Sequence, residues 1–216
     1  MLLLALDTST PAITAALADD RRVLAERTTV DPRRHGELLA PGIADVLARA
    51  GVRRDELTHV IVGVGPGPFT GLRVGLATAL TLGEALEVPV HGVCSLDVLA
   101  WDGEEPGEFA VATDARRREV YWARYTDRRT RVEGPSVGRP AEVAPVLGTL
   151  PVVGAGALMY PDVLRPGRGP RHPSAAAMAA LASERLAAGE SLLPPRPLYL
   201  RRPDAVEPGL RKPVLR

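Results

Sequence analysis

Residues 2–29 read LLLALDTSTPAITAALADDRRVLAERTT, a pattern that predicts three consecutive β-strands. Leu2 to Asp7 is an apolar run, and Ala12 to Ala18 resumes it after the turn-forming Ser9-Thr10-Pro11. Val23 to Thr29 is the third run, which follows a charged turn. Because the connections are short, we expect the three strands to form an antiparallel meander.

Helices and strands alternate after this meander. Apolar residues recur at helical spacing between Asp31-Pro32 and Ala50, and Gly51 marks the end of that helix. Leu57 to Val64 is almost continuously apolar and β-branched, which is typical of a strand buried on both faces. A helix over Leu72 to Leu86 and a strand over Val88 to Val93 complete the first half.

The second half repeats this order without repeating the sequence. Phe109 to Asp114 again ends in an aspartate, as Leu2 to Asp7 does. The further predicted elements are strands over Glu119 to Thr126 and Arg131 to Val137, a short helix over Glu142 to Leu147, a strand over Pro151 to Gly154 and a helix over Ser174 to Ala188. Both halves therefore follow strand-strand-strand-helix-strand-helix.

This repeat predicts an α/β fold made of duplicated lobes, each a mixed sheet with helices. That is the architecture of actin-like proteins, sugar kinases and heat-shock ATPases (the ASKHA group, RNase H-like). We expect residues 1–105 to form an N-terminal lobe and residues 106–216 a C-terminal lobe with a proline-rich tail from Pro194. Asp102 to Gly107 breaks both periodicities and marks the boundary.

Composition excludes several classes of protein. Hydrophobic residues make up 45% of the 216, enough for a substantial core, so a disordered chain is excluded. Cys94, the single cysteine, cannot form an internal disulfide, which argues against a disulfide-stapled secreted domain. We found neither a signal-like leader nor a membrane span and expect a cytoplasmic protein.

Charge is divided unequally along the chain. Residues 1–110 carry 9 basic and 16 acidic side chains, a net −7, whereas residues 111–216 carry 18 and 10, a net +8. The two halves are therefore expected to have different surroundings.

Two aspartates are candidates for a cleft between the lobes. Asp7-Thr8-Ser9 could hold a phosphate through hydroxyls and amides while the acid positions a hydrated magnesium ion. The alternative, which the spacing alone favours, is an Asx-type turn that serves only the fold. Asp114 ends the equivalent strand of the second half, so duplication would put the two acids across the cleft.

The segment from Gly65 to Arg73 reads GPGPFTGLR, follows a buried strand and opens a helix. It is neither a P-loop nor a dinucleotide fingerprint, and its two prolines remove two N–H donors. Gly71, Gly75, Ala79 and Gly83 then fall four residues apart on the helix, so another backbone can approach closely. Periodicity leaves open whether that backbone belongs to the same lobe or to a partner.

His35 and the arginine run from Arg116 to Arg118 are two further candidates, each with a simpler alternative. His35 would need a second histidine four residues on to form a metal pair, and position 39 is leucine, so no metal site is predicted. Arg116, Arg117 and Arg118 are interleaved with aromatic residues downstream and could meet RNA. A solvated hairpin is the more common outcome of such a run.

Together these motifs resemble those of the TsaB (YeaZ) family. The residues that carry the resemblance are Leu4 to Ser9, His35-Gly36-Glu37, Gly65 to Gly67 with Phe69 to Arg73 and Gly75, Ser95-Leu96-Asp97, Asp114 to Arg116 with Glu119 to Tyr121, and Pro197 to Arg201. The resemblance implies a non-catalytic subunit that pairs with the TsaD catalytic subunit and the TsaE ATPase to form threonylcarbamoyladenosine in tRNA. Pro68 replaces the serine usual in that family.

The resemblance also assigns expectations to residues. The partner interface would comprise Leu38, Leu39, Ile43, Gly71, Leu72, Gly75, Ala79 and Gly83. A vestigial cleft would comprise Asp7, Thr8, Ser9, His35, Gly65, Gly67 and Asp114, with no cofactor or metal unless ATP and Mg²⁺ bind weakly or at a subunit interface. Contact with tRNA would occur through the complex, and the chain alone would form a homodimer. Gly75→Leu is expected to abolish pairing and leave the fold intact. The alternative function is an actin-fold, ATP-dependent small-molecule kinase that uses Asp7 and Asp114.

Overall fold

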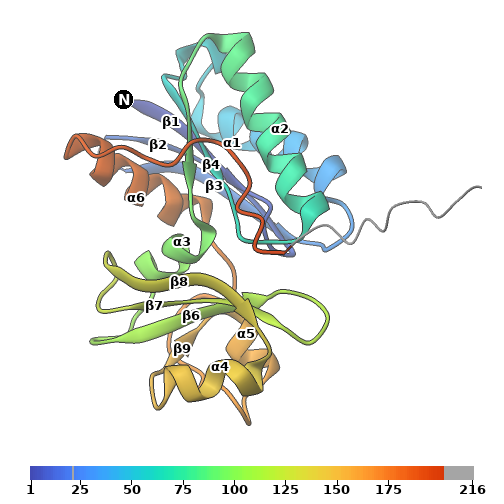
Figure 1. The fold of residues 1–216 in the computed structure, drawn as a ribbon. Helices are drawn as coiled ribbons and strands as arrows, with labels where there is room; N and C mark the ends of the chain where they lie inside the picture. Colours follow the sequence, from blue (N-terminus) through green and yellow to red (C-terminus); the bar gives the residue numbers. More distant parts are fainter. Residues whose placement is uncertain (21, 202–216) are drawn as a thin grey trace, which may run out of the picture.

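The computed structural model describes residues 1–20 and 22–201, which form two mixed sheets with helices packed on them (Figure 1). The elements of the first half are β1 (Leu2–Asp7), β2 (Ala12–Asp19), β3 (Val23–Val30), α1 (His35–Ala50), a 3-10 turn (Arg54–Glu56), β4 (His59–Gly63), α2 (Phe69–Leu86), β5 (Val90–Val93) and α3 (Ser95–Trp101). Those of the second half are β6 (Phe109–Asp114), β7 (Val120–Tyr125), β8 (Arg131–Gly138), α4 (Pro140–Leu147), β9 (Val152–Val153), α5 (Ala155–Met159) and α6 (Ala175–Ala187).

The second sheet repeats the topology of the first without its fifth strand. The first has the order β3-β2-β1-β4-β5, in which β1, β2 and β3 are antiparallel and β1, β4 and β5 are parallel. The second has the order β8-β7-β6-β9, again an antiparallel meander followed by a parallel strand. The predicted α/β class and the duplicated lobes are confirmed.

The first sheet is covered on both faces. Helices α1 and α2 lie on one face of this sheet and α6 on the other (Figure 1). Leu4 and Leu6 of β1 belong to the core beneath α1 and α2, whereas Leu3 and Ala5 belong to the core beneath α6. Successive side chains of a strand point to opposite faces, so a strand buried on both sides needs apolar residues throughout. This explains why β1 is a continuous apolar run.

Helix α6 departs from the predicted repeat. The sequence pattern made it the last helix of the second lobe, but Ala175, Met178 and Leu181 pack against the first sheet. The helix that follows β9 in the second lobe is instead the five-residue α5. Residues 175–187 therefore belong in space to the first lobe, although they follow the second sheet in sequence. Ser174 caps α6, since its Oγ accepts from Ala177 N at 3.1 Å.

The segment after α6 also returns to the first sheet. Leu193 and Gly92 exchange two backbone hydrogen bonds of 2.7 and 3.1 Å, and Leu198 N donates to Val64 O at 2.9 Å. Leu198 packs against the core beneath α1 and α2, and both Leu198 and Leu200 pack against the core between α3 and the second sheet. Residues 202–216, the rest of the predicted tail, lie outside the described residues.

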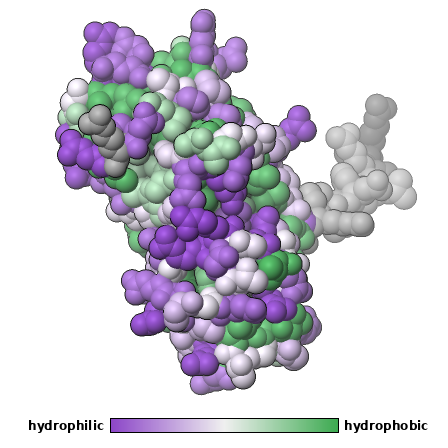
Figure 2. Space-filling model, turned by 90° about the vertical axis from the view of Figure 1, so that its left-hand side faces the viewer, coloured by the Kyte–Doolittle hydropathy of each residue, from purple (hydrophilic) through white to green (hydrophobic). Residues whose placement is uncertain are grey.

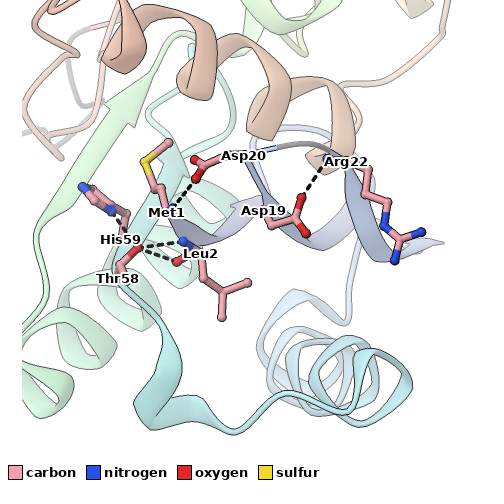
Figure 3. A network of polar contacts seen from close by, with 7 residues as sticks. All are labelled: Met1, Leu2, Asp19, Asp20, Arg22, Thr58 and His59. Atoms are coloured by element: carbon pink, nitrogen blue, oxygen red, sulfur yellow. Dashed lines mark hydrogen bonds and ion pairs between the residues drawn. The ribbon is translucent and has the colours of Figure 1, made fainter.

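Polar contacts hold the start of β1, the central strand of the first sheet (Figure 3). Thr58 Oγ1 accepts from Leu2 N and donates to Leu2 O, both at 2.9 Å, which fixes the start of β1 beside β4. The Met1 amino group donates to Asp20 Oδ2 at 2.6 Å. Within residues 1–20 and 22–201, every helix is too short or too polar to cross a membrane.

Candidate functional site

Asp7 lies at the carboxyl end of β1 and is fully buried. Its Oδ1 accepts from Ser9 N and Ser9 Oγ, both at 2.7 Å, and its Oδ2 accepts from Ser95 Oγ at 2.6 Å. Burial raises the pKa of this carboxyl, and the hydrogen bonds from Ser95 and Ser9 counteract that rise. Asp7 therefore closes an Asx-type turn and ties it to α3, the alternative that spacing favoured.

Glycines bring α2 against this turn. A Cβ at Gly67 would lie 2.2 Å from Ser9 O, one at Gly71 would lie 2.4 Å from Thr8 O, and one at Gly75 would lie 2.5 Å from Thr8 Oγ1. Thr8 Oγ1 also donates to Gly71 O at 2.7 Å. No side chain fits between the first turns of α2 and the β1–β2 loop, so three glycines are required there.

The small stripe on α2 thus faces its own lobe. Gly71, Gly75, Ala79 and Gly83 are buried, and a Cβ at Gly83 would lie 2.1 Å from Val90 Cγ2. Leu39, Ile43 and Leu72 are also buried, while Leu38 is partly exposed. Seven of the eight residues assigned to a partner interface are enclosed within the chain, so they shape the helices but cannot themselves form the contact surface. The expectation that Gly75→Leu leaves the fold intact is corrected for the same reason.

His35 opens α1 and serves the same loop. Its Nε2 donates to Thr10 O at 2.8 Å, across 25 residues of sequence. Leu39, one turn later, is buried in the core. Among the described residues, no group of three or more His, Cys, Asp or Glu side chains could hold a metal ion.

A cleft separates the β1–β2 loop and the start of α2 from the end of β6. The cleft contains three cavities of about 420, 250 and 250 Å³. Pro68 and Arg116 border all three. Asp114 lies in the cleft and pairs with Arg116 at 3.6 Å, with Arg116 N donating to its Oδ1 at 2.7 Å. The predicted opposition of two acids across the cleft is not observed, because Asp7 is sealed beneath its own turn.

The turn between β6 and β7 has an unusual backbone. Arg116, Arg117 and Arg118 have φ values of 61°, 54° and 60°, all in the left-handed region. For non-glycine residues this region costs about 1–2 kcal/mol each. Strain of this kind is often retained at functional positions.

A buried polar cluster joins the lobes behind the cleft. Asp97 Oδ1 on α3 accepts from Tyr125 Oη at 2.8 Å and from Arg131 Nη1 at 3.0 Å. The same Arg131 nitrogen lies 3.3 Å from Cys94 Sγ. Burial, and then the Asp97 charge, raise the pKa of the Cys94 thiol to about 12, so Cys94 is an inert core thiol.

Sequence reasoning missed several residues of the cleft. Phe69 stacks on Tyr199 with ring centroids 5.4 Å apart, and the Arg73 guanidinium lies 4.2 Å from the Phe69 ring centre. Thr113, Arg171 and His172 border one of the smaller cavities. Residues 160–174 have no periodicity from which the position of Arg171 or His172 could have been predicted. Thr113 could have been found, because it directly precedes Asp114 at the end of the repeated strand.

Known proteins resemble this chain over most of its length. The family model for tRNA N6-adenosine threonylcarbamoyltransferase (TsaD) matches residues 22–153. An uncharacterized protein of Mycobacterium tuberculosis is 47% identical over 207 residues, covering 94% of this chain and 92% of that protein. The tRNA threonylcarbamoyladenosine biosynthesis protein TsaB of Escherichia coli is 37% identical over 128 residues, which span 58% of this chain and 55% of TsaB.

Solved structures agree with the sequence matches. YeaZ from Pseudomonas aeruginosa superposes with a TM-score of 0.75 at 33% identity and covers 92% of this chain and 99% of that one. A crystal structure described as similar to peptidase YeaZ from the same organism gives a TM-score of 0.80 at 32% identity, with coverage of 93% and 99%. The duplicated actin-like architecture predicted from the repeat is confirmed by these neighbours.

Proposed function

Because the chain belongs to the TsaB (YeaZ) family, we propose that it is a non-catalytic partner subunit that pairs with the TsaD catalytic subunit, and with the TsaE ATPase, in forming threonylcarbamoyladenosine in tRNA. Its curated relatives support a part in threonylcarbamoyladenosine biosynthesis. We infer the pairing with TsaD from the outer surface of α1 and α2.

That outer surface is made largely of small and apolar side chains. Helices α1 and α2 lie side by side on one face of the first sheet (Figure 1). Helix α1 exposes Ala40, Pro41, Ala44 and Ala48, and α2 exposes Ala77, Ala85 and Leu80, the last with 45% of its surface accessible. Small residues on two adjacent helices allow two further helices to approach closely and pack as a four-helix bundle.

The buried residues first assigned to the interface support this surface from beneath. Gly71, Gly75 and Gly83 seat α2 against the sheet, and Leu39 and Ile43 seat α1. The opposite side of the molecule, which carries α6, has its apolar residues in patches divided by polar ones (Figure 2). A helical partner therefore fits the α1–α2 side better.

Ala44→Arg is expected to lower the affinity for TsaD at least about 100-fold, because it buries an unpaired charge at the interface. The thermal midpoint of the isolated chain should hardly change, since Ala44 is exposed. Calorimetry with purified TsaD measures the affinity. In a reconstituted modification reaction the variant should act as if the subunit were omitted.

Ala180→Arg, an exposed alanine-to-arginine change on α6, is the matched control and should bind TsaD normally. If the chain forms a homodimer when alone, as we propose, Ala44→Arg should also make it monomeric in sedimentation. If Ala44→Arg bound TsaD with unchanged affinity, the proposal that α1 and α2 form the interface would be wrong.

Direct tRNA contact is proposed at the turn of Arg116, Arg117 and Arg118. Arg118→Gly should stabilise the isolated chain by about 1 kcal/mol because glycine tolerates φ of 60°. It should also weaken tRNA binding by the assembled complex. The slope of the logarithm of the binding constant against the logarithm of salt concentration should fall in magnitude by about 1. Arg118→Ala is the control: it should weaken tRNA binding equally without stabilising the chain. Unchanged filter binding for both variants would exclude a contact by Arg118.

A kinase remains the second candidate on fold grounds alone, and the state of Asp7 opposes it. Both oxygens of this carboxylate are occupied by Ser9 and Ser95, and the residue has no exposed surface. A carboxylate that positions a hydrated magnesium ion must reach the cleft. Nucleotide titration with turnover measurements distinguishes the two functions.

A further inference from the structure

One of the two 250 Å³ cavities in the cleft is bordered by two residues that each carry a buried polar atom without a hydrogen-bond partner among the described residues. Thr113 is 97% buried, and its Oγ1 has no hydrogen-bond partner among the described residues. His172 Nδ1, on the same cavity, is likewise buried without a partner in that part of the chain. Buried polar groups are nearly always hydrogen-bonded, so two such atoms on one cavity indicate that a molecule completes them.

The charges around the cavity favour a single negative charge. Arg116 and Arg171 border it with Asp114, and Arg116 is already paired with Asp114. Burial, and then the neighbouring Arg171 charge, lower the pKa of His172, so its ring is neutral near pH 7. The two arginines and Asp114 therefore give the lining a net charge of +1. Because Arg116 pairs with Asp114, Arg171 supplies the positive charge that is left over. A phosphate dianion would face Asp114 without sufficient compensation.

The rest of the lining is apolar, and the cavity is small. Val30, Met159 and Pro11 supply apolar walls. A volume of 250 Å³ equals about eight water molecules in the liquid and falls just below the range of about 300–1,000 Å³ typical of drug-sized ligands. The site thus suits a compact organic molecule rather than a nucleotide.

We propose that this cavity binds a small organic monocarboxylate carrying a hydroxyl or similar hydrogen-bonding group. Its carboxylate pairs with Arg171, and its polar group uses the Thr113 hydroxyl and the His172 ring. The cavity is formed by this chain alone, so the purified full chain is sufficient for the test, and the outcome is independent of any partner subunit.

The test is thermal unfolding of the full chain with lactate, 3-hydroxybutyrate or 2-hydroxyisovalerate, and with inorganic phosphate or Mg-ATP as contrasting probes. At about ten times its Kd, at least one monocarboxylate should raise Tm by about 3 °C or more. Amide shifts of Thr113 and His172 in ¹H–¹⁵N spectra should saturate over the same concentrations.

Thr113→Val removes the unpaired hydroxyl while keeping the shape of the side chain. It should not destabilise the chain, and it should abolish the Tm rise. Arg171→Gln, at an exposed position, should weaken the response at least about tenfold. Ser183→Ala is the matched control: Ser183 Oγ is also buried without a partner among the described residues, but it borders a different cavity beside Trp101.

The proposal is overturned if no monocarboxylate raises Tm, which would mean that ordered water satisfies both atoms. It is also overturned if the response survives in Thr113→Val and Arg171→Gln. A response to phosphate or Mg-ATP alone would assign the cavity to another class of ligand.

Discussion

Gly75→Leu is expected to destabilise the chain by about 3 kcal/mol or more, the upper range of overpacking effects. Even the first added carbon would lie 2.5 Å from Thr8 Oγ1 and 3.6 Å from Leu6 Cδ1. Thr8 Oγ1 cannot withdraw without giving up its hydrogen bond to Gly71 O. The helix must therefore move off the sheet. Urea unfolding monitored by circular dichroism measures the loss.

Gly36→Ala on α1 is the matched control. A Cβ there meets nothing within 4 Å, and the residue is in a helix, so alanine should stabilise by about 0.5–1 kcal/mol. If Gly75→Leu unfolded at the wild-type urea concentration but no longer bound its partner, a small local shift would have accommodated the leucine beside Thr8 without loss of folding free energy. The stripe would then regain a direct role in pairing.

The sequence predicted the strands of both meanders to within a few residues. Each consists of local apolar runs closed by recognisable turns, so no long-range information was needed. The bounds of β1 and β6 match the apolar runs that end in Asp7 and Asp114. The repeat of these runs was also sufficient to predict two lobes, because in each half an antiparallel meander is followed by a parallel strand.

The sequence could not say which lobe α6 covers. Its alanine-rich face suits any flat apolar surface, and the deciding contacts are side chains far away in sequence, such as Glu26 Oε1, which accepts from Ser174 Oγ at 2.8 Å and Ala176 N at 3.1 Å. The short helices α3 and α5 were missed because seven and five residues are too few for a helical period.

The same limit applies to the candidate site. A four-residue spacing of glycines indicates that a backbone approaches α2, but does not identify that backbone; the β1–β2 loop is revealed only by the fold. The cavity beside Thr113 draws on β6, the loop before α6 and the β1–β2 loop. No pattern within any one of those segments predicts it.

Asp7 supplies the second large effect. Asp7→Ala is expected to cost about 3 kcal/mol or more, because Ser9 N, Ser9 Oγ and Ser95 Oγ would lose their acceptor inside the core. Asp7→Asn should be mild at neutral pH, because its amide oxygen still accepts from Ser9 and its amide nitrogen can donate to the Ser95 hydroxyl. Chemical unfolding of both variants tests the structural role.

The pH dependence distinguishes Asn from Asp more sharply. Because burial raises the pKa of Asp7, the folded state holds this proton more tightly than the unfolded state does. The resulting stabilisation is complete below the unfolded pKa near 3.8 and is lost as pH rises through the folded pKa. Asparagine cannot titrate, so the stability of Asp7→Asn relative to wild type should improve across that window. A flat difference, or a loss that grows with pH, would mean that the folded protein favours the carboxylate and would reopen a charged role for Asp7.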